Sequence, residues 1–269
     1  MDISAFLCKT LLVVLLLSPA YCFGESATFC YEDKNYEPYV FNYSNYENIP
    51  NGLLINIIRS AAHKANLPIK FIRRPWLRCQ QMVKDNQAQA LFAMIKTPVR
   101  ATSFTYPTNI NQALMTVEYG LFIKKTGLLD NKNTLKDITS VGNRLNLENY
   151  KKYLKLGLSA PTGYVVNDIL FKHDSLSNFE YTLDEGFLAV AENRLDGYVV
   201  SKLIGFNKIN EYDLSNLIYW SNIILASNDW YIPFNNEYYQ LHKIQIEQFW
   251  HEISNVKDEE ISQYFSEFK

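Results

Sequence analysis

The sequence has no excess of either charge, few cysteines and no apolar run long enough to cross a membrane. Twenty-six Lys and Arg side chains against 28 Asp and Glu leave a net charge of -2, which excludes the basic surface that nucleic-acid binding requires. No apolar run reaches the roughly 18 residues of a membrane-spanning helix. A 269-residue chain with 48% hydrophobic and 20% charged residues is instead typical of a globular protein with one large domain or two lobes.

Motifs for nucleotide binding and for common hydrolytic chemistry are also missing. The chain contains no G-x-S-x-G, G-x-G-x-x-G, P-loop or H-E-x-x-H sequence. His242 and His251 are nine positions apart, a spacing that does not favour a zinc site on one helix. We therefore expect neither a metal nor a cofactor.

Residues 1–24 have the pattern of a secretory signal peptide. A short segment with one lysine precedes the apolar run LLVVLLL, and Pro19 is followed by small residues. Cleavage after Cys22 and cleavage after Gly24 both fit this pattern. The mature protein is expected to be periplasmic, without stable insertion in the membrane.

Only Cys30 and Cys79 remain after cleavage, in a compartment where disulfides persist. An even number of cysteines in an oxidising space favours a Cys30–Cys79 bridge over two buried free thiols, which is the alternative. The bridge would close a loop of about 50 residues, which stabilises the fold by roughly 4 kcal/mol in the chain-entropy description.

Strand and helix patterns alternate along the mature chain, and the alternation occurs in two series. This order predicts two doubly wound α/β lobes, each a sheet flanked by helices. Thr182 and Glu185 form the capping-box pattern of a helix start. The expected strands are 28–31, 69–72, 90–95, 114–123, 155–158, 179–181, 196–200 and 217–226, and the expected helices begin at Gly52, Trp76, Thr97, Leu147, Gly163, Thr182, Asn236 and Asp258.

Two cationic segments, 73–79 and 96–100, each follow a predicted strand. Ligands of open α/β sheets bind beyond the carboxyl ends of the strands, where helices begin. Thr97 and Pro98 form a good helix start, so Arg100 is placed to hold a carboxylate with two parallel hydrogen bonds. The alternative is a solvated surface arginine.

A series of short segments follows the predicted signal peptide in a fixed order. They are Tyr36-Glu37-Pro38-Tyr39, Asn51-Gly52-Leu53-Leu54, Pro75-Trp76, Ala90-Leu91, Thr97-Pro98-Val99-Arg100, Phe104-Thr105-Tyr106-Pro107 and Asn193-Arg194-Leu195-Asp196-Gly197-Tyr198-Val199-Val200. With these segments the chain resembles the periplasmic solute-binding proteins of the polar amino-acid type (bacterial extracellular solute-binding protein family 3).

The resemblance implies a two-lobe clamshell (type II), in which lobe one comprises 25–116 and 226–269 and lobe two comprises 117–225. The lobes close over a ligand held in the cleft. It also implies that Arg100 binds the carboxylate of the ligand and that Tyr39 packs against it.

Further cleft residues are predicted around these two. Trp76 and Arg78 follow one predicted strand, and Trp76 is equally suited to pack between the sheet and the helix. The backbone N–H groups of Thr162, Gly163 and Tyr164 are expected to complete the anion site from the other lobe. Family members that bind amino acids usually have Ser or Thr in the segment before the arginine, whereas this chain has Ala93 to Ile95 there. In those proteins an Asp holds the ammonium group of the ligand, and Ser201 stands in its place here. The departures predict a carboxylate-bearing, partly apolar or aromatic ligand rather than a standard α-amino acid.

Aromatic residues are abundant, at 14% of the chain, and several gather in the first loop. We expect some of them, with Trp76 and Tyr164, to form an apolar wall beside Arg100. The loop aromatics are Tyr36, Tyr39, Phe41, Tyr43 and Tyr46.

The sequence thus predicts a monomeric, non-enzymatic binding protein that delivers a small solute to an ABC permease of the inner membrane. A sensor or co-receptor with the same fold is the alternative. A dehydratase-like enzyme would need a cleft acid or base. Glu32, Asp33 and Glu37 are the only acids near the predicted cleft in lobe one, and no paired base is visible.

Overall fold

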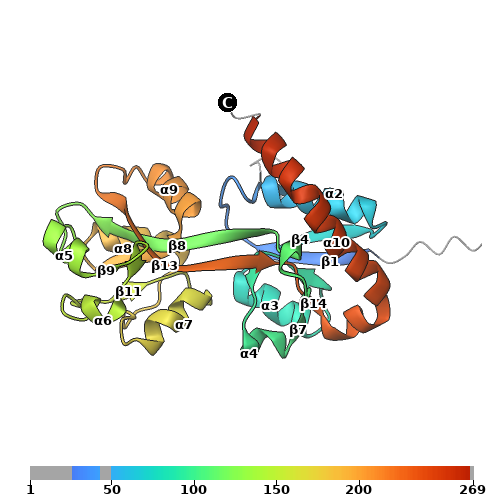
Figure 1. Cartoon of the computed structure of the whole chain (residues 1–269), viewed down its shortest axis with the longest axis horizontal. Coiled ribbons are helices and arrows are strands. Elements are labelled where there is room, and N and C mark those ends of the chain that lie inside the picture. The colour runs from blue at the N-terminus through green and yellow to red at the C-terminus, as the bar shows by residue number, and fades with distance from the viewer. Residues whose placement is uncertain (1–25, 43–49, 267–269) are drawn as a thin grey trace, which may run out of the picture.

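The computed structural model describes residues 26–42 and 50–266, which form two lobes joined by two long strands (Figure 1). The predicted signal peptide, residues 1–24, lies outside the described residues, as do Tyr43 and Tyr46. Within the described ranges, no helix combines the length and the apolar character needed to cross a membrane.

The first lobe, on the right in Figure 1, is built on a five-stranded sheet of order β4-β1-β5-β14-β7. β1 pairs in parallel with β4 and β5, whereas β14 is antiparallel to β5 and β7. The strands are β1 (Ala27–Glu32), β4 (Ile69–Arg74), β5 (Ala90–Leu91), β7 (Phe104–Thr105) and β14 (Phe234–Asn235). Its other elements are β2 (Phe41–Asn42), β3 (Pro50–Asn51), α2 (Leu53–Lys64), α3 (Trp76–Lys84), α4 (Pro98–Ala101), η1 (Ile110–Gln112) and α10 (Asn236–Ser266).

Aromatic side chains fill the core of this lobe. The ring of Phe29 on β1 meets Phe234 of β14 and Phe249 of α10 edge to face, with centroids 5.6 and 5.7 Å apart. Such pairs add to the stabilisation from apolar burial. α2 covers the sheet with Leu54, Ile57 and other buried residues, which confirms its predicted 3.6-residue period.

The second lobe is built on a sheet of order β11-β12-β8-β13-β10-β9. Five helices pack around it, and α8 begins with the predicted capping box of Thr182 and Glu185. The strands are β8 (Met115–Lys124), β9 (Thr139–Ser140), β10 (Arg144–Leu145), β11 (Leu158–Ser159), β12 (Gly197–Ser201) and β13 (Ile218–Tyr231). The helices are α5 (Lys132–Asp137), α6 (Leu147–Tyr150), α7 (Val165–Lys172), α8 (Leu183–Ala191) and α9 (Lys202–Glu211).

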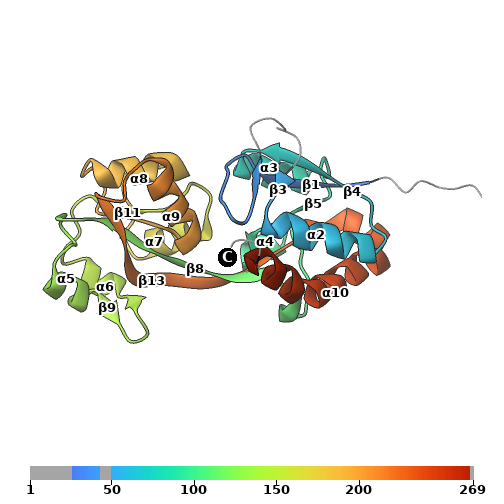
Figure 2. The same cartoon turned by 90° about the horizontal axis from the view of Figure 1, so that it is seen from above.

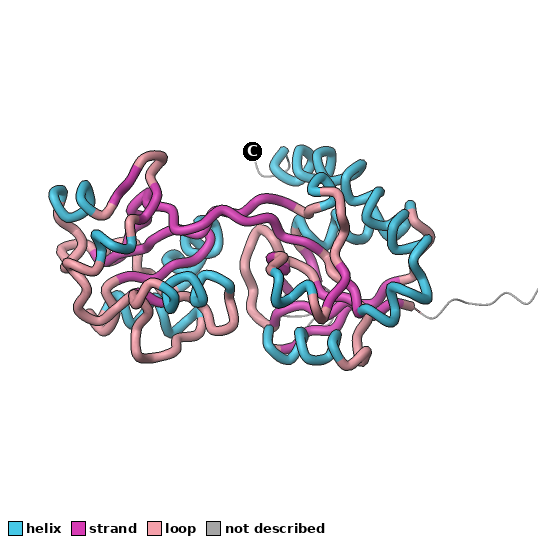
Figure 3. Tube along the Cα trace, turned by 60° about the horizontal axis from the view of Figure 1, so that its bottom comes forward, coloured by secondary structure: helices cyan, strands magenta, loops and turns pink. Residues whose placement is uncertain are grey.

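β8 and β13 run side by side from one lobe to the other (Figures 2 and 3). They pair antiparallel from Lys124 with Ile218 to Met115 with Trp230. The short strand β6 (Met94–Ile95) of the first lobe pairs with the end of β13, where Ile95 lies opposite Trp230. The lobes therefore share a sheet at their junction, and the two long strands form the connection between them.

A disulfide joins Cys30 of β1 to Cys79 of α3, with Cα atoms 5.4 Å apart. The predicted pairing is confirmed. Glu32 follows Cys30 at the end of β1, and Trp76 opens α3. The bridge therefore links the two elements that carry these side chains.

Three predicted elements are wrong in detail. The expected strand 90–95 is broken at Ala93, whose φ of 60° interrupts the extended backbone between β5 and β6. Residues 179–181 form no strand, and only Tyr181 makes an isolated bridge, to Pro161. Two helices do form at the C-terminus, within α10, but they meet at a kink at His242 rather than shortly before Asp258.

The expected strand 155–158 is also wrong, since the strand there is Leu158–Ser159. The backbone N–H groups of Lys155, Leu156 and Gly157 donate to Asp196 Oδ2 at 2.9 to 3.0 Å, so they are not available for a strand ladder. Tyr150 Oη donates to the same oxygen at 2.7 Å, and Tyr150 is the last residue of α6. Asp196 is therefore a structural side chain that ties the loops of lobe two together.

Candidate ligand pocket between the lobes

A pocket lies between the lobes around Arg100. The first lobe, the junction strands and the start of α7 all contribute to its walls. The lining residues are Glu32, Tyr36, Trp76, Ala93, Ile95, Arg100, Tyr119, Tyr164, Val165 and Trp230.

Arg100 is held by the start of α4. Thr97 Oγ1 accepts from the Arg100 N–H at 3.1 Å, which confirms the predicted cap. The guanidinium donates from Nη1 to the Ile95 carbonyl at 3.2 Å and from Nη2 to the Gly163 carbonyl, across the cleft, at 3.0 Å. Burial lowers the pKa of Arg100, and within the described residues it forms no ion pair. The guanidinium therefore offers a positive charge to the pocket.

The backbone beside Arg100 is unusual at Ala93. A φ of 60° is uncommon for a residue with a Cβ, and Ala93 lines the pocket. The kink separates β5, in the first sheet, from β6, which pairs with β13. It thereby brings the Ile95 carbonyl to Arg100, and such local strain is often found at binding sites.

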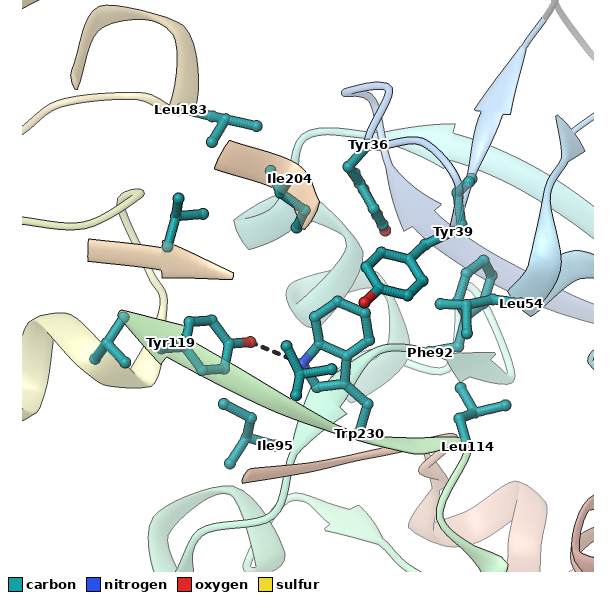
Figure 4. Close-up of a cluster of buried hydrophobic side chains, with 14 of the residues drawn as sticks. Tyr36, Tyr39, Leu54, Phe92, Ile95, Leu114, Tyr119, Leu183, Ile204 and Trp230 are labelled. Atoms are coloured by element: carbon teal, nitrogen blue, oxygen red, sulfur yellow. Dashed lines mark hydrogen bonds between the residues drawn. The ribbon is translucent and has the colours of Figure 1, made fainter. Parts of the chain in front are cut away.

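The junction strands supply an aromatic floor to the pocket. Trp230 Nε1 on β13 donates to Tyr119 Oη on β8 at 2.7 Å (Figure 4). Burial raises the pKa of Tyr119 and also that of Tyr36, so both phenols are neutral at neutral pH. The pocket is thus mostly apolar and aromatic, with a few polar atoms.

Glu32 brings a carboxyl group into the same pocket. It is the last residue of β1, and Tyr164 Oη of the second lobe donates to its Oε2 at 2.8 Å. Burial raises the pKa of Glu32 to about 7, although the hydrogen bond from Tyr164 acts in the opposite direction. An arginine and a carboxyl group with a strongly shifted pKa therefore share one pocket, a common property of functional sites.

The structure gathers part of the predicted site at this pocket. Its lining includes the predicted residues Trp76, Ala93, Ile95, Arg100 and Tyr164. Gly163 adjoins it through its carbonyl oxygen, which also accepts from Trp76 Nε1 at 3.4 Å.

Four predicted residues lie elsewhere. Tyr39 packs behind the floor, with its ring 5.3 Å from Trp230 and tilted by 71° (Figure 4). Arg78 is exposed on α3. Ser201 is buried near Tyr39 in a separate surface depression. Thr162 donates from Oγ1 to the Tyr181 carbonyl at 3.4 Å and lines adjacent depressions.

The segment 162–164 also differs from the expected anion site. The Tyr164 N–H is bonded to the Pro161 carbonyl at 3.0 Å, within a local turn. The segment instead presents a carbonyl and a phenol to the cleft, and both contact groups of the first lobe.

Several lining residues were not predicted as site residues. Tyr119 and Trp230 lie on strands whose pattern indicates only a buried core, whereas Tyr36 is one of the first-loop aromatics expected beside Arg100 and lines the pocket with Trp76 and Tyr164. Glu32 was expected near the cleft but not as a ligand-binding residue, although it ends a buried parallel strand, the same kind of position that pointed to the Arg100 segment.

No protein-family model and no curated protein sequence matches this chain. Solved structures do. A histidine kinase sensor domain with similarity to periplasmic binding proteins aligns over 90% of this chain and 93% of its own, at 15% identity and a TM-score of 0.68. The P235GK mutant of ArgBP from T. maritima aligns over 90% and 95%, at 12% identity and a TM-score of 0.67.

The GluR0 ligand-binding core from Nostoc punctiforme, in complex with L-glutamate, also matches. It aligns over 89% of this chain and 96% of its own, at 18% identity and a TM-score of 0.62. Identities this low establish the fold alone. The chain has the two-lobe α/β fold of the periplasmic binding proteins, as its resemblance to the polar amino-acid type implied.

Proposed function

We propose that the protein binds a small carboxylate-bearing solute in the pocket around Arg100, without catalysing a reaction. The observation that carries the proposal is the Arg100 guanidinium, which is half-buried between the lobes and bonded to two carbonyl oxygens, with no ion pair among the described residues. A buried cation of this kind gains most from an anionic partner, and a planar guanidinium matches a carboxylate.

The lobes proposed to close on the solute are 25–116 with 226–269, and 117–225. β8 and β13 are the connections about which they would move. Gly163 and Tyr164 of the second lobe contact Arg100 and Glu32 of the first, and these contacts support a closing movement that completes the site.

The proposed ligand differs from the one that the sequence favours. With Ser201 in place of an Asp, the amine of an amino acid was expected to lack a carboxylate partner. Glu32 supplies a carboxyl group in the pocket that contains Arg100. Amino-acid-like solutes therefore fit the proposal, with the apolar part of the solute against Trp76 and Tyr164. Among the described residues that line the pocket, there is no second carboxylate, histidine or lysine that would act as a partner base, which favours binding over catalysis.

In the proposed setting, the protein is a periplasmic monomer that delivers its solute to an ABC permease in the inner membrane. A role as an extracytoplasmic sensor is the second candidate, favoured by the likeness to a histidine kinase sensor domain. Both roles require the same pocket and the same closure.

A thermal-shift panel of amino acids, other carboxylates, short peptides and sugars tests the proposal. A bound solute at a hundredfold excess over its Kd stabilises the folded protein by about 2.7 kcal/mol. We expect carboxylates to raise the melting temperature and uncharged sugars to leave it unchanged. A response to sugars alone would refute the carboxylate site.

A further inference from the structure

Glu32 is half-buried at the contact between the lobes, where Tyr164 of the second lobe donates to its carboxyl group. Among the described residues, its one side-chain hydrogen bond comes from Tyr164 Oη, at 2.8 Å. No ion pair among the described residues includes Glu32, and the neighbouring Lys34 pairs instead with Asp184 at 3.0 Å. A buried carboxylate in this state is costly, so a proton or a cation stabilises it.

The groups that face Glu32 do not provide that cation. Its own loop brings Asp33, Lys34 and Tyr36. Arg100 lies in the same pocket but bonds to carbonyl oxygens. The groups that face Glu32 from other elements are Asp184 of α8, Tyr119 of β8, Tyr164 at the start of α7 and Tyr198 of β12. Burial raises the pKa of Glu32 to about 7, and the charges of Asp33 and Asp184 also raise it, whereas the hydrogen bond from Tyr164 and the charge of Lys34 act in the opposite direction.

We propose that Glu32 receives a protonated amine of the ligand, whose charge takes the place of the proton on the buried carboxyl group. The proposal rests on the proposed function, because Arg100 must hold the carboxylate of the same ligand. The exchange is balanced: the O–H bond of Glu32 breaks, its proton leaves to solvent, and the carboxylate pairs with an amine that keeps its own protons. Capture of such a ligand is thereby coupled to the release of one proton.

This arrangement places both charged recognition groups in the first lobe. In the resembled family the amine partner belongs at the place of Ser201, which here is 1% exposed and lies outside the pocket. The second lobe contributes the Tyr164 phenol and the Gly163 carbonyl instead. In this proposal the first lobe binds the two charged groups of the ligand, and the second lobe contributes hydrogen-bonding groups when the lobes close.

The direction of the pH dependence follows from the carboxyl group. Below pH 7 the buried Glu32 holds a proton that an amine must expel, so binding of an amine-bearing carboxylate strengthens as pH rises. The gain is up to about tenfold per pH unit between pH 5.5 and 7, and it levels off above pH 7. A carboxylate without an amine gains nothing from this rise.

The test uses the standard L-amino acids, each paired with the carboxylic acid that lacks its amine, such as L-phenylalanine with 3-phenylpropanoic acid. Titration calorimetry at pH 6 in buffers of different ionisation enthalpy counts the protons released. For the responding pair we expect the amine-bearing member to bind at least about tenfold more tightly, with close to one proton released.

Variants separate the contributions. Glu32→Gln should abolish the amine preference and the proton release while it preserves binding of the amine-free acid. Tyr164→Phe leaves Glu32 in place but removes a hydrogen bond that lowers its pKa, so the midpoint of the pH dependence should move upward. The wild-type proton count and Tyr164→Phe remain informative if Glu32→Gln does not fold.

The outcomes distinguish this proposal from the function on which it rests. Equal binding of both members of a pair, without proton release, would overturn the role of Glu32 and leave the carboxylate site at Arg100 intact. The same binding of amine-bearing ligands by Glu32→Gln would also overturn it. No binding by any compound would overturn both proposals.

Discussion

The two lobes are stabilised in different ways. In the first lobe a disulfide joins β1 to α3, and a cluster of aromatic rings fills the space behind β1. In the second lobe a single carboxylate, Asp196, gathers three backbone N–H groups and the Tyr150 hydroxyl. The first arrangement is covalent and apolar, whereas the second depends on hydrogen bonds.

This difference corresponds to what each lobe brings to the pocket. The first lobe carries the charged groups, Arg100 on α4 and Glu32 two residues after Cys30 of the disulfide. The second lobe carries a carbonyl and a phenol, at Gly163 and Tyr164, which meet those charges across the cleft. With the proposed closure, the first lobe would supply the charges and the second lobe would supply hydrogen-bonding groups to the same ligand.

Loss of the disulfide should have the largest effect on stability, and it should fall on the first lobe. We expect the double variant Cys30→Ser/Cys79→Ser to lose about 4 kcal/mol of unfolding free energy, because the closed loop is about 50 residues long. Denaturant unfolding measures the total loss of unfolding free energy, and hydrogen exchange shows which elements lose stability. Amides of β1 and α3 should lose protection before those of β12. Equal loss in both lobes would show that they are not held separately.

Removal of the Asp196 carboxylate is the matching change in the second lobe. Asp196→Ala leaves three backbone N–H groups without their acceptor, so we expect a loss of about 2 to 3 kcal/mol. Asp174→Asn is the control, since it removes the charge of a side chain that is 88% exposed and whose ion pair with Lys151 spans 3.6 Å, and Asn tolerates the φ of 50° at this position. If both variants had the same stability, the carboxylate would not be what holds the loops of this lobe.

Closure of the lobes can be tested at Gly163 with a smaller expected effect. A Cβ there would lie 2.6 Å from Leu77 Cδ2 of the opposite lobe, and the φ of Gly163 is +81°. We expect Gly163→Ala to weaken ligand binding about fivefold, since the added methyl group crowds the closed form.

Gly142→Ala is the matched control for that variant. Gly142 has a φ of +74° but nothing within 4 Å of its added Cβ, so the backbone cost is similar and the contact between lobes is unaffected. A similar loss of affinity in both variants would remove the evidence for closure at Gly163.

The sequence predicted much of the fold because periodicity reports burial directly. The face of α2, the cap at Thr97 and the capping box at Thr182 all depend on neighbouring residues alone. The failures depend on distant partners. The segment 155–157 is drawn out of a strand by Asp196, about 40 positions away, and that contact has no local signal.

The pocket was predictable to a similar degree. Arg100 was found because it follows a strand and opens a helix, two features visible in order along the chain. Tyr119 and Trp230 meet only because β8 pairs with β13, which no local pattern specifies. The resemblance placed Ser201 in the site, but Ser201 lies outside the pocket. The carboxyl group in the pocket is that of Glu32, in the opposite lobe.

Titration calorimetry of Arg100→Ala against Arg78→Ala tests whether Arg100 holds the ligand, with the best carboxylate from the thermal-shift panel as the ligand. Both variants remove an arginine from the same lobe, but only Arg100 lines the pocket, and Arg78 is exposed. The account predicts at least about thirtyfold weaker binding for Arg100→Ala, and less than about twofold change for Arg78→Ala. Unchanged affinity in Arg100→Ala, with its melting temperature preserved, would contradict the account.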